Sequence, residues 1–229
     1  MSSKITNAER RRVQRQRRRT LNIIIVAGIS LIAAAFILIL VLQPVDDLVP
    51  ITPQTYPVPA EGLSIGNPDA PVLVEVFEDF QCPSCKQFSD AIKPQLLQTF
   101  VYNGIARLQF RHYPFIGADS LRAANATMCA NEQGRFWDFH DIVFANQLAQ
   151  NIGAYSDRRL EAMADQLGLD VAAWSACYDE DRYEVDIQAD QADAGARGVT
   201  GTPTIFVNGG RVAQNDFTSI AAAINAARP

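Results

Sequence analysis

The chain has 229 residues, of which 48% are hydrophobic and 20% are charged, and its formal net charge at pH 7 is −5. This length permits one domain of ordinary size plus appendages and excludes an array of several domains. The net charge conceals an asymmetry. Residues 1–20 contain Lys4 and seven arginines against one acid, Glu9, whereas the rest of the chain has 12 basic and 24 acidic residues.

An uncharged stretch of 20 residues, 23–42, follows the basic tail. At a rise of about 1.5 Å per residue, it is long enough to span the roughly 30 Å hydrocarbon core of a bilayer. Because the arginine cluster directly precedes it, the positive-inside rule places the N-terminus in the cytoplasm. The sequence therefore predicts a basic cytoplasmic tail at 1–20 and a transmembrane anchor at 21–42. The protein would be a single-pass protein of the cell membrane whose remaining domain is extracytoplasmic.

Two alternatives for this N-terminal region are weaker. An arginine-rich tail can bind nucleic acid, but beside a membrane span it more commonly sets orientation, so no nucleic-acid partner is expected. The run Ala33-Ala34-Ala35 resembles a signal-peptide cleavage site, yet the apolar stretch continues to Leu42, which favours an uncleaved anchor. The exported domain would then lie in an oxidising compartment, where disulfides persist.

Prolines are dense after the anchor, with seven of them between residues 43 and 71. Such a segment is extended and semi-rigid and has no core of its own. The sequence predicts a proline-rich linker at 43–62 that holds the following domain, 63–229, away from the bilayer surface.

The stretch Phe80-Gln81-Cys82-Pro83-Ser84-Cys85 contains a C-x-x-C motif. It follows a strand-like apolar run and precedes a helix-compatible stretch, 86–99, which is the redox arrangement of thioredoxin-like folds. The free N–H groups and the positive end of the helix dipole favour a thiolate at Cys82, which is the species that attacks disulfides. Cys85, one turn along, is placed to resolve the mixed disulfide.

A C-x-x-C motif can also be half of a zinc site. Zinc requires four ligands, usually with a second pair at short spacing. The other cysteines, Cys129 and Cys177, and the histidines, His112 and His140, do not have that spacing. A metal site is therefore the weaker interpretation, and none is predicted.

Alternating and periodic patterns predict the remaining elements. Strand signals lie at 72–77, 105–112, 204–207 and 211–213, with Asn208-Gly209 as the hairpin turn between the last two. Residues 118–196 read as four or five helices, and a closing helix starts near Asp216. Pro94 should kink the helix that follows the C-x-x-C motif. The predicted class is α/β, with an all-helical insertion at about 118–196.

Three acids precede the motif, and the sequence does not decide among them. Glu75, Glu78 and Asp79 each qualify as the proton acceptor near the buried cysteine. His112 is expected to be a structural residue at a strand end rather than a catalytic one.

The chain resembles the DsbA-like thiol–disulfide oxidoreductases of the thioredoxin superfamily. The resemblance covers about residues 63–229, and it rests on four motifs that occur in order: 66–71 (GNPDAP), 80–86 (FQCPSCK), 131–141 (NEQGRFWDFHD) and 198–204 (GVTGTPT). It implies a thioredoxin-like fold with a helical insertion.

The resemblance implies a site as well. Cys82 and Cys85 would be the catalytic pair, with Pro83 and Ser84 in the active-site loop. Thr202 and Pro203 would form the cis-proline loop that offers backbone groups to an extended substrate. Two departures stand out. The dipeptide Pro83-Ser84 replaces the Pro-His of the best-known member, which predicts a less acidic Cys82. Val76 stands where thioredoxins carry a buried acid, six residues before the first cysteine.

Four cysteines allow three pairings in an oxidising compartment. With Cys82 and Cys85 kept as the redox pair, Cys129 and Cys177 remain, and similar anchored members carry a second, structural disulfide in this place. Such a bond would close a loop of 49 residues and add on the order of 4 kcal/mol by the chain-entropy estimate. The alternative is two free buried thiols.

The resemblance leads to a predicted function. The chain would introduce disulfides into exported proteins, with reduced or misfolded protein thiols as substrates. A membrane redox partner, either DsbB-like or a vitamin K epoxide reductase homologue, would reoxidise it, and no cofactor is expected. One alternative is a disulfide reductase or isomerase that uses the same pair. Another is a chaperone-like or metal-binding module with a structural C-x-x-C.

Overall fold

The structure is a computed structural model that describes residues 7–41 and 47–229, and it divides into two compact units, Met1–Asp46 and Asp47–Pro229. The described part of the first unit is one helix, α1 (Asn7–Val41). Within α1, the 19 residues of Thr20–Leu38 are long and apolar enough to cross a membrane, by length and composition. Leu42 of the expected anchor, the first part of the expected tail (1–6) and the first residues of the expected linker (43–46) lie outside the described residues.

The second unit is built on a mixed sheet with the strand order β1-β2-β4-β3-β5-β6. Only β3 and β4 pair in parallel, and the other neighbouring strands are antiparallel. The strands are β1 (Ala60–Glu61), β2 (Ser64–Ile65), β3 (Val72–Glu78), β4 (Ala106–His112), β5 (Thr204–Val207) and β6 (Gly210–Arg211). The short hairpin β1–β2 was not predicted, because two-residue strands carry no readable alternation.

The central strand β3 is buried on both faces, because successive side chains of a strand point to opposite sides of the sheet. Val72, Val74 and Val76 belong to the main core. Phe77 points the other way and packs in a small cluster with Ala194 and other residues near the end of helix α8 (Glu184–Ala196). Glu75 and Glu78, three residues apart, therefore lie on opposite faces of the sheet.

The helix after the C-x-x-C motif runs from Pro83 to Val101 and contains two wide, π-type turns. Its segments are α2 (Pro83–Gln87), η1 (Phe88–Ile92), α3 (Lys93–Leu96) and η2 (Leu97–Val101). The first wide turn comes directly before Pro94, and the Lys93 N–H bonds to the Phe88 carbonyl, five residues back. The irregularity expected at Pro94 takes this form, since a proline has no N–H to donate and crowds the preceding turn.

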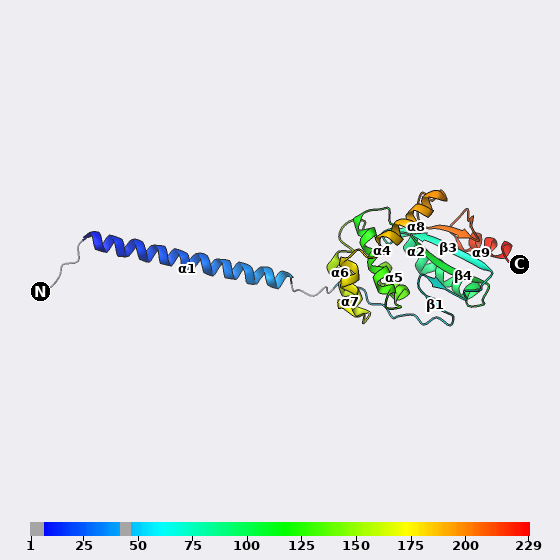
Figure 1. The fold of residues 1–229 in the computed structure, drawn as a ribbon, viewed down its shortest axis with the longest axis horizontal. Coiled ribbons are helices and arrows are strands. Elements are labelled where there is room, and N and C mark those ends of the chain that lie inside the picture. The colour runs from blue at the N-terminus through cyan, green and yellow to red at the C-terminus, as the bar shows by residue number, and fades with distance from the viewer. Residues whose placement is uncertain (1–6, 42–46) are drawn as a thin grey trace. The chain divides into compact units, whose positions relative to one another are not determined.

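Five helices lie between β4 and β5, where the sequence predicted four or five. They are α4 (Ala118–Asn131), α5 (Phe136–Ala145), α6 (Asp157–Gln166), α7 (Val171–Asp179) and α8. Figure 1 shows α4, α5, α6 and α7 grouped at one end of the sheet. The chain then returns through β5, the β6 hairpin and α9 (Phe217–Ala226). Asn208 and Gly209 both have positive φ (46° and 80°), as the predicted two-residue turn requires. The α/β class is confirmed, although β6 is shorter and starts earlier than expected.

Residues 47–58, called the strap from here on, lie against the domain. Four of its apolar side chains pack on the main core: Leu48, Ile51, Tyr56 and Val58. The Asn146 side chain both accepts from the Val49 N–H (2.7 Å) and donates to the Val49 carbonyl (2.9 Å). The prolines predicted an extended segment without a core of its own, and the apolar residues between them give this segment a surface to bury against the domain.

Candidate active site

Cys82 stands at the N-cap of α2 and Cys85 in its first turn, directly after β3. Both sulfurs are free, and both residues are buried: Cys82 is 8% exposed and Cys85 is 0% exposed. In its protonated form, the Cys82 thiol donates to the Thr202 carbonyl at 3.3 Å. The strand–helix junction therefore presents one sulfur to the rim of the site and keeps the other inside.

The two thiols differ strongly in acidity. A hydrogen bond from the Cys85 thiol is the largest influence on Cys82, and it outweighs burial and lowers the Cys82 pKa to about 5. The Thr202 side chain, together with the backbone N–H groups of Ser84 and Cys85, lowers the Cys82 pKa further. Burial raises the pKa of Cys85 well above its ordinary value. At neutral pH the pair holds a thiolate at Cys82 and a thiol at Cys85.

The Thr202–Pro203 peptide bond is cis. β5 begins at the next residue and pairs with β3, Thr204 lying opposite Phe77, so the loop before it comes to the C-x-x-C motif. The Thr204 hydroxyl donates to the Gly201 carbonyl (2.7 Å), and the Asn215 side chain donates to the Pro203 carbonyl. The structure thus brings Cys82 beside Thr202.

The other residues predicted for the site, in the C-x-x-C loop and the cis-proline loop, also lie beside the two cysteines. Pro83 and Ser84 are exposed in the first turn of α2, next to the sulfurs, whereas Pro203 is buried. The Thr202 hydroxyl is buried and has no hydrogen-bond partner within the described chain, so it is free to donate to a thiolate.

The three candidate acids occupy different environments. Glu75 forms ion pairs with Arg111 and Arg197 (2.8 Å each), on the face of β3 away from the cysteines. Asp79 accepts four hydrogen bonds, from the Ser120 hydroxyl and from three backbone N–H groups, those of Gln81, Phe115 and Ile116. Both carboxylates are satisfied by structural partners, so neither is placed to take a proton from Cys85.

Glu78 differs from both. It is 3% exposed, and its Oε2 atom has no hydrogen-bond partner within the described chain. Burial raises the pKa of Glu78 to about 8, which the charge of Lys93 and the thiol of Cys85 only partly offset. A carboxyl that titrates near neutrality beside a high-pKa thiol has the properties of a proton acceptor and donor.

The two histidines are structural and uncharged at neutral pH. Burial lowers the pKa of His112 to about 3 and that of His140 to about 4. The His112 ring packs against Phe110, with ring centroids 4.8 Å apart, and its backbone N–H bonds to Asp190 (2.8 Å). Within residues 7–41 and 47–229, no group of three or more His, Cys, Asp or Glu side chains could hold a metal ion.

Comparison with known proteins agrees with this geometry. The family model described as Thioredoxin matches residues 60–226. A probable disulfide bond formation protein D of Bacillus anthracis is 30% identical over 166 residues, covering 71% of this chain and 76% of that protein. The chain is a DsbA-like member of the thioredoxin superfamily. Its enzyme class is thiol–disulfide oxidoreductase.

Solved structures of this superfamily show the same fold. The oxidised BdbD of Bacillus subtilis aligns with a TM-score of 0.67 at 26% identity, over 72% of this chain and 92% of that one. DsbA of Chlamydia trachomatis aligns with a TM-score of 0.61 at 23% identity, over 80% and 96%. The expected thioredoxin-like fold with a helical insertion is confirmed.

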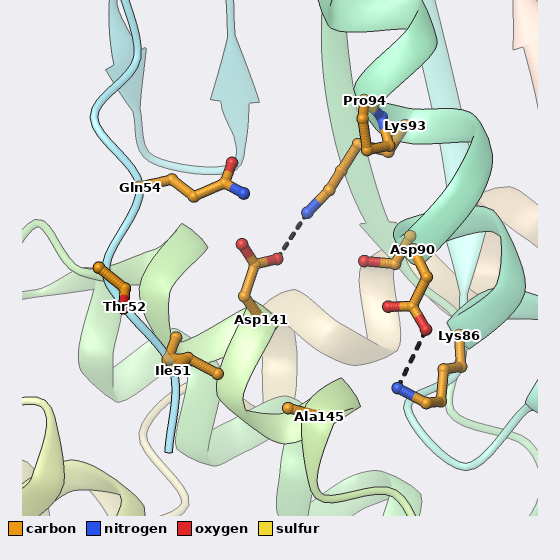
Figure 2. A pocket seen from close by; sticks show the side chains of 10 residues that line it. Ile51, Thr52, Gln54, Lys86, Asp90, Lys93, Pro94, Asp141 and Ala145 are labelled. Carbon is orange, nitrogen blue, oxygen red and sulfur yellow. Dashed lines mark hydrogen bonds and ion pairs between the residues drawn. The ribbon is translucent and has the colours of Figure 1, made fainter. Parts of the chain in front are cut away.

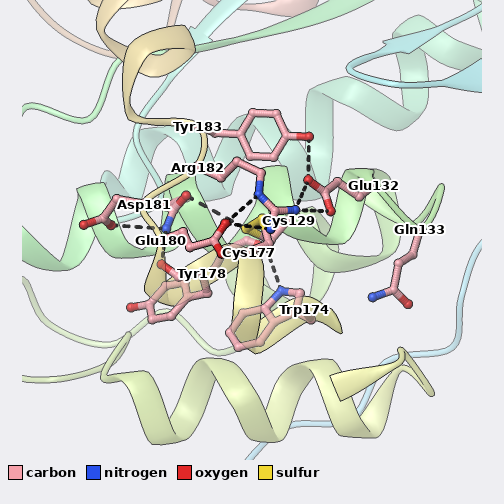
Figure 3. Close-up of a disulfide and its surroundings, with 12 residues drawn as sticks. Cys129, Glu132, Gln133, Trp174, Cys177, Tyr178, Glu180, Asp181, Arg182 and Tyr183 are labelled. Carbon is pink, nitrogen blue, oxygen red and sulfur yellow. Dashed lines mark hydrogen bonds and ion pairs between the residues drawn. A yellow bond between two sulfur atoms is a disulfide. The ribbon is translucent and has the colours of Figure 1, made fainter. Parts of the chain in front are cut away.

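In this DsbA-like chain the structure joins Cys129 of α4 to Cys177 of α7 in a disulfide (Figure 3). Both cysteines are fully buried. Beside the bridge, the Trp174 indole donates to the Ala126 carbonyl (3.0 Å). The Arg182 backbone N–H donates to the Cys177 carbonyl (3.4 Å), and the Arg182 side chain pairs with carboxylates that include Glu132 at 2.8 Å. The bond therefore joins two helices of the insertion rather than the insertion to the sheet.

Sequence reasoning missed the contribution of the insertion to the site. The Gln147 side chain, just after α5, donates to the carbonyls of Phe80 (2.7 Å) and Cys82 (3.1 Å). The Tyr155 hydroxyl also donates to the Phe80 carbonyl (2.9 Å). These contacts fix the position of the loop that carries Cys82. No local pattern in the sequence indicates that Gln147 or Tyr155 would bind this loop.

Proposed function

We propose that the chain oxidises dithiols of exported proteins with its Cys82–Cys85 pair. The observation that carries this proposal is the asymmetry of the pair, a thiolate at Cys82 beside the cis-proline loop and a buried thiol at Cys85. A stabilised Cys82 thiolate is a good leaving group, which favours the reduced form of the enzyme and makes its disulfide oxidising.

The proposed exchange has two steps. A substrate thiolate attacks the Cys82 sulfur, the Cys82–Cys85 bond breaks, and Cys85 leaves with the electron pair and takes a proton from Glu78. The second substrate thiol loses its proton to solvent and attacks the mixed disulfide. This step releases an oxidised substrate and the Cys82 thiolate. Two electrons pass to the enzyme.

The remaining roles follow from the loop contacts. Thr202 offers its carbonyl to an extended substrate chain, and Pro203, with no N–H, keeps that edge free for pairing. Pro83 and Ser84 are exposed beside the sulfurs and form the surface that meets the substrate. Cys129 and Cys177 are structural and take no part in the exchange.

The proposed location rests on α1. A helix with a spanning stretch at Thr20–Leu38, preceded by arginines, would place the N-terminus in the cytoplasm and residues 47–229 outside. A membrane partner, either DsbB-like or a vitamin K epoxide reductase homologue, would accept the two electrons and restore the disulfide. A C-terminal alkaline phosphatase fusion should be active in this topology and inactive in the reverse one.

The second candidate function is the reverse use of the same pair, as a reductase or isomerase. The Cys82 pKa of about 5 lies between the values of about 7 in thioredoxin and about 3.5 in DsbA. It therefore favours an oxidant of intermediate strength. The deciding experiment equilibrates the full chain, in detergent, with glutathione buffers of known ratio.

A reduction potential between about −120 and −180 mV supports disulfide donation. A value near about −270 mV, as in thioredoxin, would overturn the oxidase assignment in favour of a reductase. A Cys82→Ser variant that keeps its fold and its full activity would exclude both, in favour of a binding module with a structural C-x-x-C.

A further inference from the structure

The connection between α5 and α6, residues 146–156, contacts the backbone of the C-x-x-C loop. Gln147 is the second residue after α5, and its side-chain Nε2 atom lies 2.7 Å from the Phe80 carbonyl oxygen and 3.1 Å from the Cys82 carbonyl oxygen. A side-chain amide nitrogen carries two N–H groups, so it can donate to both acceptors at once. Gln147 therefore joins the two peptide bonds that flank the segment Gln81-Cys82.

The direction of the Cys82 carbonyl controls how the first cysteine is placed on the helix that carries the second. Cys82 has an extended conformation (φ −80°, ψ 118°), and Pro83 opens α2 with a φ that its ring holds at about −65°. The turn between the two cysteines is therefore set by the ψ of Cys82, which the direction of its carbonyl defines. The N–H groups of Cys85 and Lys86 bind this carbonyl from the helix (3.1 Å each), and Gln147 binds it from the insertion.

The backbone around Gln147 is itself held in place. The Gln147 N–H bonds to the Phe144 carbonyl (3.2 Å), which extends α5 by part of a turn. The neighbouring Asn146 side chain donates to the Ile142 carbonyl (2.9 Å) and exchanges two hydrogen bonds with Val49 of the strap. Because a side chain can position its partner only as firmly as it is held itself, these contacts make Gln147 a suitable fixed point.

A second contact ties α5 to the helix of the cysteines (83–101) independently of Gln147. Lys93 of that helix is 3% exposed, and its Nζ atom lies 2.5 Å from an Asp141 carboxylate oxygen of α5. Figure 2 shows this pair, with Ala145 at the end of the same α5. The pair fixes α5 beside the middle of the helix of the cysteines. Gln147, two residues beyond Ala145, then fixes the loop at the start of that helix.

Loss of the Gln147 amide would leave neither carbonyl without a partner. The Phe80 carbonyl also accepts from the Tyr155 hydroxyl (2.9 Å), and the Cys82 carbonyl keeps the two N–H groups of the helix. A buried polar group that keeps one partner avoids the full cost of an unmade hydrogen bond. The contacts of Gln147 are therefore dispensable for satisfying these carbonyls, whereas no other side chain joins the two.

We propose that Gln147 is a positioning residue for thiol–disulfide exchange: by joining the Phe80 and Cys82 carbonyls, it holds the Cys82 sulfur in line for attack by Cys85. This inference rests on the Cys82–Cys85 pair proposed above. The step concerned begins with an external thiol bound to Cys82 as a mixed disulfide. Cys85 loses its proton to the Glu78 carboxylate, and the Cys85 thiolate attacks the Cys82 sulfur. The bond to the external sulfur breaks, and the external thiolate leaves with the electron pair.

Closure of the mixed disulfide depends on this geometry more than its formation does. A small disulfide from solvent can adjust its approach to Cys82, whereas Cys85 is 0% exposed and fixed in the helix. Between fixed groups, a misplacement of about 1 Å can cost up to about 100-fold in rate. Loss of the Gln147 donors should therefore slow closure by roughly tenfold and leave formation of the adduct unchanged. Because no titrating group is removed, the factor should be the same from pH 6 to pH 8.

The test uses the full reduced chain in detergent, mixed with oxidised glutathione, quenched with acid and analysed by mass spectrometry. This separates the Cys82–glutathione adduct from the closed Cys82–Cys85 disulfide. Gln147→Met keeps the length of the side chain and removes both N–H groups. In this variant the adduct should form at the wild-type rate and then persist about ten times longer. Gln150→Met is the matched control, because Gln150 is exposed in the same connection, and it should close like the wild type.

Closure at the wild-type rate in a folded Gln147→Met variant would overturn the inference. Equal slowing of adduct formation and closure would also overturn it, because that result indicates a general disturbance of the site. If the variant does not fold, Gln147→Asn keeps an amide that is one methylene too short for both contacts, and wild-type closure in it would refute the role. A strongly reducing wild-type potential would refute the oxidase proposal alone, since electron flow in either direction passes through this closure step.

Discussion

Replacing Glu78 with glutamine tests whether this carboxyl is a neutral acid at physiological pH. Burial raises its pKa from the ordinary 4.5 to about 8. Between these values the unfolded chain has lost the proton and the folded chain keeps it, so the stability of the wild type falls as the pH rises through this window. At pH 7 the difference amounts to about 3 kcal/mol, at roughly 1.4 kcal/mol for each pH unit above 4.5.

The assay is guanidinium denaturation of residues 47–229, which contain the whole described core of the domain, in the reduced state from pH 5 to pH 8. Both proteins carry the same Cys82 thiolate, so its contribution largely cancels in the difference. Relative to the wild type, the free energy of unfolding of Glu78→Gln should increase as the pH rises, by about 2.5 kcal/mol between pH 5 and pH 7. Glu61→Gln, which changes an exposed acid, should follow the wild-type curve.

Parallel curves for the wild type and Glu78→Gln would refute the reasoning. They would mean that Glu78 ionises at the same pH in the folded and unfolded chains. It could not then be the protonated acid that supplies the proton to Cys85 in the proposed exchange.

Two further predictions concern the cysteines. The ultraviolet absorbance of the reduced chain should show one thiolate titrating near pH 5. Cys85→Ala should raise that midpoint, because it removes the strongest hydrogen-bond donor to Cys82. A wild-type midpoint near pH 9 would contradict this prediction. Replacing Cys129 and Cys177 together by alanine should reduce the free energy of unfolding by about 4 kcal/mol, because the bond spans a sequence separation of 48, while the Cys82 titration stays unchanged. Denaturation curves check the second prediction, and an unchanged midpoint of unfolding would refute it.

Much of the fold could be predicted because its signals are local. The apolar run of β3, the C-x-x-C motif at a strand–helix junction and the Asn208–Gly209 turn each need only a few adjacent residues to be recognised. The same applies to the helices of the insertion, whose apolar positions repeat at helical spacing. The cis state of the Thr202–Pro203 bond came only from the family resemblance, since most X-Pro bonds are trans.

The choice among the acids required the three-dimensional structure. The alternation along β3 separates Glu75 from Glu78, but only the packing of the helices shows which face holds the cysteines. Asp79 could not be excluded either, because its partners come from Ser120 and a loop far along the chain. The burial of Lys93 was missed for a related reason. A lysine in an amphipathic helix is expected at the surface, and only the structure shows that it is buried and paired with Asp141 of α5 (2.5 Å).

The packing of the strap, in contrast, could have been predicted from the sequence. Its prolines predicted an extended spacer without a core of its own, and the backbone at 47–59 indeed forms no helix or strand. The apolar side chains between the prolines indicated that the segment packs against the domain. Leu48, Ile51, Tyr56 and Val58 recur every two to five residues, and the domain buries them.

The buried Cys129–Cys177 disulfide constrains when the insertion can be oxidised. Neither Cys129 nor Cys177 is exposed in the finished fold, so another protein's disulfide cannot reach them there. Their bond has to form while α4 and α7 are still apart. Oxidation of this pair therefore belongs to the folding of each new copy of the chain and not to the exchange reactions of the folded enzyme.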